Sequence, residues 1–240
     1  MVAPGDDLAG LIADALEQAG DRLADGDVLV VAQKVVSKAE GRLVRLTDVV
    51  PTPDAKAIAE RAGKDPAVVT VVMAEAAEVM RVVPGVVITR HRAGHVLANS
   101  GVDASNALPG GNHVVLWPED PDRSARGLRT ALQARFGVRI AVIVSDSLGR
   151  AWRLGTIGTA IGSAGLKPLR DRRGEPDLFG RRMEATLIAV ADEIASAASL
   201  VLGEAAEAVP AAIVRGAVFD ADEDAGIGAI LRPIAQDLFR

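Results

Sequence analysis

The sequence predicts a mixed α and β protein, because apolar segments with two different periodicities alternate along the chain. Short runs rich in β-branched residues, such as Val28 to Ala32, are typical of buried strands. Segments in which apolar residues recur three and four positions apart, such as the one after Gly5-Asp6-Asp7, are typical of amphipathic helices. The chain has 240 residues, 49% of them hydrophobic, which is enough for one large domain or two small ones.

Composition and charge exclude several functional classes. The formal net charge of -5 provides no global basic field for nucleic acid or an anionic membrane. Cysteine is absent, which excludes disulfides, thiolate metal sites and cysteine nucleophiles and favours a cytoplasmic location. The segment from Met1 to Gly10 lacks the apolar run of a signal peptide. An alanine-rich segment near the C-terminus contains Asp192 and Glu193, so it predicts a core helix and not a membrane span.

The helices of the N-terminal third are marked by their first residues. Gly5-Asp6-Asp7 provides an N-cap for a helix that runs to about Ala19, and Thr52-Pro53-Asp54 starts a second helix that runs to about Ala62. Asp65-Pro66 starts a third in the same way. Because valines and methionines recur at helical spacings, we expect this third helix to continue through Met80 and to end at Pro84-Gly85.

A hairpin should follow, with a strand over 86–89 and a return strand over 95–98. His91 and His95 flank its turn and are two of the three histidines in the chain. Histidines four residues apart across a glycine turn have a poor geometry for a metal site. We therefore expect both at the surface.

The rest of the chain continues the alternation of strands and helices. The expected elements are a strand over 113–117, a helix from Asp120-Pro121 through Phe136, a strand over 139–144, a long helix over 184–202 and a strand over 211–215.

The main candidate functional residues follow the expected strand over 139–144. Ligands gather at the carboxyl ends of strands in open α/β sheets, and Asp146 and Ser147 offer the hard oxygen ligands that suit Mg²⁺ or Mn²⁺. Arg150 and Arg153 offer planar guanidinium groups for phosphate or carboxylate. The alternative is a strand capped by an ordinary Asp-Ser turn with two solvated arginines.

Two further polar clusters follow apolar strands. The segment over 33–42 could form a phosphate cradle, but the spacing of a P-loop is missing, and a solvated helix face that carries Lys34 and Lys38 is the favoured interpretation. In the second cluster, Asp103 is a candidate ligand for a hard metal ion and Asn106 a candidate contact for a base, sugar or phosphate. The alternative is an Asx-turn that satisfies only the local backbone.

Glycines mark two more segments. Four of them lie within the apolar stretch over 154–165, which predicts either tight packing or a ligand against the backbone. Gly203 is expected just after the last turn of the long helix. Glu204 and Glu207 follow at a helix end that is already negative, so a bound cation would favour them.

A set of short motifs then occurs in a fixed order. They are Gln33-Lys34-Val35-Val36-Ser37-Lys38-Ala39-Glu40-Gly41-Arg42, Gly101-Val102-Asp103-Ala104-Ser105-Asn106, Ser145-Asp146-Ser147-Leu148-Gly149-Arg150, Ala160-Ile161-Gly162-Ser163-Ala164-Gly165, Val190-Ala191-Asp192-Glu193-Ile194-Ala195 and Val214-Arg215-Gly216. This set resembles the coenzyme F420-0:L-glutamate ligases, the γ-glutamyl ligases that add glutamate to a deazaflavin cofactor precursor. The resemblance covers nearly the whole chain and is closest to the stand-alone form of the family, without a nitroreductase-like domain.

The resemblance implies an α+β fold over residues 1–240, with mixed sheets, packed helices, two intertwined subdomains and a homodimer. It also implies GTP, two divalent cations (Mg²⁺ or Mn²⁺) and K⁺. By position, Asp146, Asp103 and Lys38 match catalytic residues; Gln33, Lys38, Asn106, Gly203 and Glu204 match nucleotide-contacting residues; and Asp103, Asp146, Ser147 and Glu204 match metal ligands.

The implied reaction joins L-glutamate to F420-0 through an acyl phosphate made with GTP, although no motif fixes GTP over ATP. The Arg170 to Arg173 cluster is a candidate for binding glutamate. In one departure, Met1 to Pro4 is too short to supply the nucleotide loop that usually comes first, so we expect either a late start site or one contact fewer. The alternatives are a related amide ligase and a nucleotide-binding protein without turnover.

Overall fold

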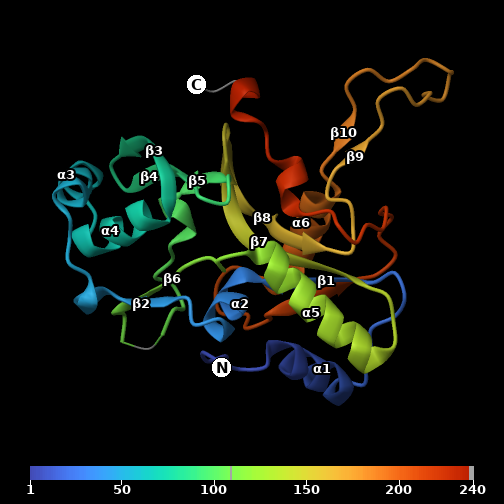
Figure 1. The fold of residues 1–240 in the computed structure, drawn as a ribbon, viewed down its shortest axis with the longest axis horizontal. Coiled ribbons are helices and arrows are strands. Elements are labelled where there is room, and N and C mark those ends of the chain that lie inside the picture. The colour runs from blue at the N-terminus through green and yellow to red at the C-terminus, as the bar shows by residue number, and fades with distance from the viewer. Residues whose placement is uncertain (109, 238–240) are drawn as a thin grey trace. The chain divides into compact units, whose positions relative to one another are not determined.

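The computed structural model describes residues 1–108 and 110–237, and these residues form two compact units (Figure 1). The first unit contains Met1–Leu8, Gln33–Asp120 and Leu148–Ile157, and the second contains Ala9–Ala32, Pro121–Ser147 and the chain from Gly158 onward. Each unit combines helices with sheets, so the expected α+β class with mixed sheets and packed helices is confirmed.

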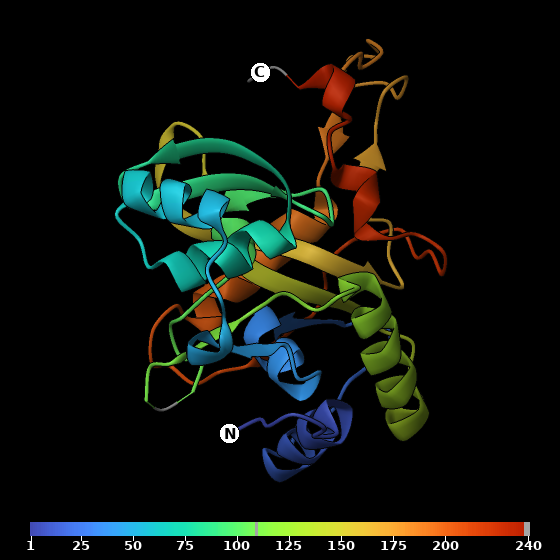
Figure 2. The same ribbon diagram turned by 60° about the vertical axis from the view of Figure 1, so that its left-hand side comes forward.

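The elements follow the expected alternation, and Figures 1 and 2 show them from two sides. The helices are α1 (Leu8–Gln18), α2 (Gln33–Ala39), α3 (Pro53–Ala62), α4 (Pro66–Glu75), α5 (Pro121–Phe136) and α6 (Val190–Leu202). The strands are β1 (Val28–Ala32), β2 (Leu43–Arg45), β3 (Ala76–Val83), β4 (Val86–His91), β5 (Val96–Ala98), β6 (His113–Val115), β7 (Ala141–Arg150), β8 (Arg153–Ala164), β9 (Arg170–Asp171), β10 (Leu187–Ile188) and β11 (Ala211–Val214). None of the helices in the described ranges is long and apolar enough to cross a membrane.

The first unit is built on small antiparallel sheets. Strands β3, β4 and β5 form one sheet in that order, and β2 pairs with β6 in another. Helices α3 and α4 begin where the sequence predicts, because Thr52 and Asp65 cap them: the Thr52 hydroxyl accepts the N–H of Ala55 at 3.2 Å. Valines from α4 and from both sheets, for example Val72, Val87 and Val114, make the apolar core of this unit together with Ala62 and Ile58 of α3.

The expected third helix is wrong beyond Glu75. The chain turns there into strand β3, which pairs with β4 from Val83↔Val86 back to Ala76↔His91. The hairpin turns at Pro84 and Gly85, where the φ of Gly85 is +84°. Valines fit a helical spacing and a strand alternation equally well over a short range, and the cross-strand partner decides between them.

His91 and His95 are buried, so their expected surface position is also wrong. They are 2% and 6% exposed and contact the ring of Trp117, with ring centroids 4.9 and 5.3 Å apart. Trp117 also explains Gly101, whose φ is +67° and where an added Cβ would lie 2.3 Å from the indole Nε1. The hairpin therefore folds its polar turn residues onto an aromatic ring.

The second unit is organised around a sheet with the strand order β11-β1-β7-β8. Strand β1 pairs in parallel with β7, with Val30 opposite Ile143, and antiparallel with β11. Helix α6 packs on β1 and β11 (Figure 1), and its apolar face joins Val28, Val30 and Ile143 in one core.

Two expected boundaries in this unit are wrong. Strand β7 does not end at Val144 but continues through the polar residues to Arg150, so the alternative of an Asp-Ser turn that caps the strand is wrong. The expected metal-ligand role of Asp146 and Ser147 stays a prediction. Helix α6 begins at Val190 and not at Glu184, because Leu187 and Ile188 pair with Asp171 and Arg170 in a hairpin. In both places hydrogen bonding to a neighbouring strand overrides the local sequence pattern.

The glycines of β8 confirm the tight-packing interpretation at two positions. A Cβ on Gly158 would lie 2.5 Å from the Ala195 carbonyl oxygen of α6, and one on Gly162 would lie 2.4 Å from the Pro121 backbone of α5. The carboxylate of Asp192 strengthens the same contact by accepting the N–H of Ala160 at 3.0 Å. The strand thus lies directly against helix backbone.

Candidate functional site

In the first unit, helix α2 carries two basic side chains that meet the segment around Asp103. The Lys34 ammonium lies 2.8 Å from Oδ2 of Asp103 and donates to the Ser105 hydroxyl at 2.8 Å. One helical turn further, the Lys38 ammonium donates to the backbone carbonyl of Asn106 at 2.6 Å. Both lysines therefore bind the same loop, although the Lys34 side chain is still 27% exposed.

The backbone holds Asp103 firmly in this cluster. Its N–H and carbonyl form a two-way bridge with Val115, at 3.0 and 2.8 Å. Its Oδ1 accepts the N–H of Ser105 at 2.6 Å, which is the Asx-turn considered from the sequence, and its Oδ2 accepts the Ser105 hydroxyl at 3.0 Å. A side chain with both oxygens engaged is fixed in orientation without being buried, since it is still 39% exposed.

The charges of this cluster shift two pKa values. Burial alone would raise the pKa of the Asp103 carboxyl, but hydrogen bonds from Lys34 and Ser105 and the charge of Lys34 hold it below its usual value. Partial burial, and then the nearby charge of Lys34, lower the pKa of the Lys38 ammonium. The cluster therefore combines an ionised carboxylate with two cations, and the two ammonium groups suit an anionic ligand such as phosphate.

Gln33 has a different role in the structure from its neighbours on α2. Its amide nitrogen donates to the Ser37 hydroxyl at 2.6 Å and to the Leu116 carbonyl at 3.0 Å. The side chain is only 2% exposed. Gln33 thus fixes α2 against the chain after β6, and its predicted contact with a nucleotide stays a prediction.

The second unit carries the other residues of the expected metal set. Asp146 and Ser147 lie side by side on β7, half-buried, and Oδ1 of Asp146 accepts the N–H of Ser147 at 2.8 Å. Gly203 follows α6 with a φ of +73°, as expected, and Glu204 is exposed in the loop after it. In the same loop the Glu207 carboxylate folds back to accept the N–H of Ala205 at 2.7 Å.

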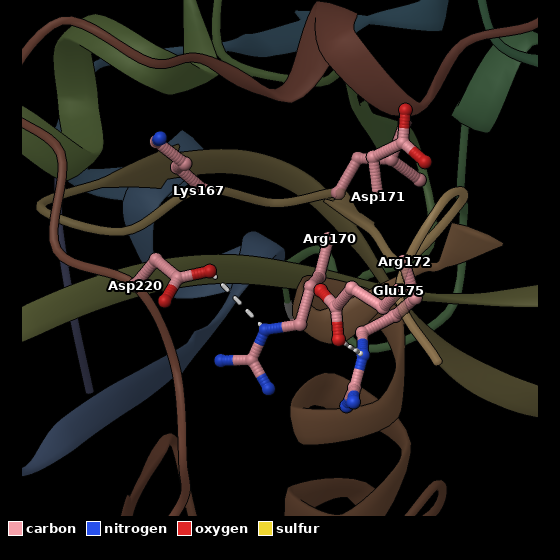
Figure 3. Close-up of a pocket in the computed structure, with 7 residues that line it drawn as sticks. Lys167, Arg170, Asp171, Arg172, Glu175 and Asp220 are labelled. Atoms are coloured by element: carbon pink, nitrogen blue, oxygen red, sulfur yellow. Dashed lines mark hydrogen bonds and ion pairs between the residues drawn. The ribbon is translucent and has the colours of Figure 1, made fainter. Parts of the chain in front are cut away.

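A cavity of about 440 Å³ also lies in the second unit (Figure 3). Three basic and three acidic side chains line it together with Leu169; they are Lys167, Arg170, Arg172, Asp171, Glu175 and Asp220. Figure 3 shows two ion pairs in its wall, Arg170 with Asp220 at 3.1 Å and Arg172 with Glu175 at 2.6 Å. Within the described residues, the Lys167 side chain has no hydrogen bond or ion pair, so its ammonium is available to an anionic ligand.

Across residues 1–108 and 110–237, no three histidine, aspartate or glutamate side chains gather in a way that could hold a metal ion. Asp103 belongs to the first unit, whereas Asp146, Ser147 and Glu204 belong to the second. Each of these residues nevertheless offers the oxygen ligands that Mg²⁺ and Mn²⁺ prefer. Asp103 in addition already holds one cation, the Lys34 ammonium.

Lys34 and Ser105 also belong to this cluster, and the sequence alone did not identify either as a partner of Asp103. The signal was present, because Lys34 and Lys38 are four residues apart and therefore lie on the same face of α2. The partner segment, 68 to 71 residues further along the chain, could not be read from that spacing.

Comparison with known proteins agrees with the motif order. The model of the family F420-0:Gamma-glutamyl ligase matches residues 1–216. A protein of Methanopyrus kandleri named coenzyme F420:L-glutamate ligase is 50% identical over 100% of this chain and 93% of its own length. Proteins of the same name from Methanothermobacter thermautotrophicus and Archaeoglobus fulgidus are 46% and 44% identical, over 100% and 90% of this chain and 95% and 84% of their own lengths. The chain therefore belongs to the F420-0:gamma-glutamyl ligase family.

Proposed function

We propose that this chain joins L-glutamate to coenzyme F420-0 by an amide bond, with GTP as the co-substrate. The observation that carries the proposal is the match, over the whole chain, to relatives whose name states this ligation. The cluster of Lys34, Lys38 and Asp103 supports the use of a nucleotide, because two ammonium groups on one helix face suit a polyphosphate.

Amide formation requires an activated carboxylate, which GTP can supply. In the proposed reaction an oxygen of the terminal carboxylate of F420-0 attacks the γ-phosphorus of GTP, the bond to the β-phosphate breaks, and an acyl phosphate and GDP result. The amine of L-glutamate then attacks the carbonyl carbon, loses a proton, and phosphate leaves. Phosphoryl transfer of this kind depends mainly on positioning and on neutralising charge, and Lys38 is the residue that we assign to the latter task.

Divalent cations, two per site and either Mg²⁺ or Mn²⁺, belong to the proposal together with K⁺ and a homodimeric assembly. When bound, such ions neutralise phosphate charge and hold the reacting oxygens. The oxygen ligands that we assign to them are Asp103, Asp146, Ser147 and Glu204, with Gly203 and Asn106 as contacts for the nucleotide.

We also assign the amino-acid substrate to the cavity in the second unit (Figure 3). Glutamate carries charges of both signs, and the cavity wall offers both. Since its arginines are already paired, Lys167 is the group that we expect to bind a carboxylate of glutamate. Lys167→Gln should raise the KM for glutamate roughly tenfold, the size of one charged contact, and leave the KM for GTP unchanged.

The matched control for that variant is Lys56→Gln, which removes an exposed positive charge on α3 of the first unit. Steady-state kinetics with varied glutamate and saturating GTP measure the effect. If both variants behave alike, the glutamate site lies elsewhere.

The experiment for the reaction itself measures phosphate release with F420-0, L-glutamate, GTP and Mn²⁺ and follows the product by mass, with ATP in parallel. Phosphate release together with one added glutamyl residue supports the proposal. Asp146→Asn should lower turnover about a hundredfold or more while the protein stays folded, whereas Asp14→Asn, at an exposed position on α1, should not. Turnover near the wild-type rate in Asp146→Asn would remove Asp146 from the mechanism.

A further inference from the structure

The Lys34 ammonium lies where a bound cation would contact the Asp103 carboxylate. It lies 2.8 Å from Oδ2 and shares Ser105 with the carboxylate, because Lys34 donates to the Ser105 hydroxyl at 2.8 Å and that hydroxyl donates to Oδ2 at 3.0 Å. The three side chains therefore form a closed triangle. A divalent ion bound through Oδ2 would meet the positive charge of Lys34 at very short range, where like charges repel strongly.

We propose that Lys34 is a resident cation that a divalent ion must displace from Asp103. While no metal ion is bound, Lys34 balances and orients the carboxylate; when a metal ion binds, the ammonium moves away. This inference rests on the proposed function, because it takes Asp103 as a metal ligand.

The surroundings of the pair allow such an exchange. The side chains of Lys34 and Asp103 are 27% and 39% exposed, so the ammonium can move into water without leaving a buried charge behind. Lysine also has a long flexible stem, unlike the planar group of arginine.

The carboxylate stays in place when the ammonium leaves. Asp103 is held by the two-way backbone bridge with Val115 and by the N–H of Ser105 on Oδ1, neither of which involves Lys34. Lys38 does not replace Lys34, since its ammonium is held by the Asn106 carbonyl at 2.6 Å. Only one of the two lysines on this face of α2 therefore competes with a metal ion for Asp103.

The test is a titration of the full chain with Mn²⁺ alone, without nucleotide, followed by electron paramagnetic resonance of the free ion. Lys34→Gln should bind Mn²⁺ about five- to tenfold more tightly than the wild-type chain, because the competing charge is gone. Lys38→Gln, the matched control, should change the affinity less than about twofold. The gain from Lys34→Gln should disappear when Asp103→Asn is added, since the two residues then no longer interact.

A second measurement uses the wild-type protein and does not depend on how any variant folds. Acylation of lysines by an amine-reactive ester, read out by peptide mass spectrometry, should be faster at Lys34 after Mn²⁺ is added and unchanged at Lys38. Unchanged reactivity of Lys34 at saturating Mn²⁺ would overturn the inference. So would a Lys34→Gln variant that binds Mn²⁺ no more tightly than Lys38→Gln does.

Failure of this inference and failure of the proposed function can be told apart. If the wild-type chain glutamylates F420-0 but Lys34 does not compete with Mn²⁺, only the inference is wrong. If Lys34 competes with Mn²⁺ but no glutamylation occurs, the inference stands and the reaction is wrong.

Discussion

Two carboxylates of the first unit, Glu75 and Asp103, each lie 2.8 Å from a basic side chain, yet their surroundings differ greatly. The Glu75 side chain is 7% exposed and contacts Arg42, Arg92 and His91. The Asp103 side chain is 39% exposed and holds a single cation, Lys34. Glu75 thus lies in a closed cluster and Asp103 in an open one.

The closed cluster joins distant parts of the unit through several contacts to one buried carboxylate. Arg42 donates to Glu75 and also to the Trp117 carbonyl at 2.8 Å, while Arg92 donates to the Ala74 carbonyl at 2.6 Å. Burial would raise the pKa of the Glu75 carboxyl, but the nearby His91 imidazole, whose Nε2 lies 3.6 Å from Oε2, and the charges of both arginines hold it below its usual value. Buried charges of this kind depend on every partner, whereas an open pair contributes little to stability and can exchange its partner. Glu75 should therefore contribute much to the stability of the unit and the Asp103 pair little.

The largest expected effect comes from breaking the closed cluster. Glu75→Gln should lower the free energy of unfolding by about 3–5 kcal/mol, because Arg42, which is only 19% exposed, loses its nearest counter-charge and keeps only the more distant Glu119 at 3.6 Å. Urea denaturation followed by circular dichroism measures the change. The isosteric Asp103→Asn is the matched control and should cost at most about 1 kcal/mol. Equal losses in the two variants would contradict the comparison.

Buried His95 lies near His91 of the closed cluster, and its pKa allows a second test with a smaller expected effect. Burial, and then the charge of His91, lower its pKa from 6.5 to about 4, and its Nε2 has no hydrogen-bond partner. Because the pKa is depressed in the folded state, the unfolded chain takes up the proton first as the pH falls. The contribution of His95 is therefore complete above about pH 6.5 and is lost between there and about pH 4, with a total of about 2–3 kcal/mol.

The measurement is the free energy of unfolding at several pH values between 4 and 7 for the wild-type chain and for His95→Leu. The wild-type curve should fall more steeply towards acid than that of the variant, which has no imidazole at this position to protonate. Parallel curves would show that the pH dependence arises elsewhere, for example at Glu75, whose depressed pKa also makes it lose stability as the pH falls.

The structure also shows which parts of the fold the sequence could predict and which it could not. Elements with a local signal, such as the capped start of α3 at Thr52 and the β-branched run of β1, lie where the sequence places them. Elements decided by a distant partner do not: Ala76 to Val83 becomes a strand because β4 pairs with it, and β7 continues past Val144. His91 and His95 are buried because Trp117, more than 20 positions away, covers them, and no pattern near the histidines reveals that ring.

The candidate site was predictable to a similar degree. The order of the motifs identified the family and selected Asp103, Lys38 and Asn106, and the structure brings the loop of Asp103 and Asn106 onto α2. The partner of Asp103 was missed, because a lysine on a helix face has the same pattern whether it faces water or a carboxylate. Motif order therefore identified the family, and the roles that it implies for these residues stay predictions. Only the contacts separate the open cluster from the closed one.

The smallest expected effect is the salt dependence of the stability that the exposed pair of Asp103 and Lys34 contributes. Asp103→Asn should lower stability by no more than about 1 kcal/mol in 0.05 M salt, and this difference should vanish in 0.5 M salt, because an exposed pair is screened within a few ångströms at that ionic strength. The loss caused by Glu75→Gln should persist in both buffers, since a side chain 7% exposed is shielded from the added ions. Urea denaturation of both variants at the two salt concentrations makes the comparison. If salt removes the effect of Glu75→Gln as well, the Glu75 cluster is as open as that of Asp103, and the expected difference between the two carboxylates is wrong.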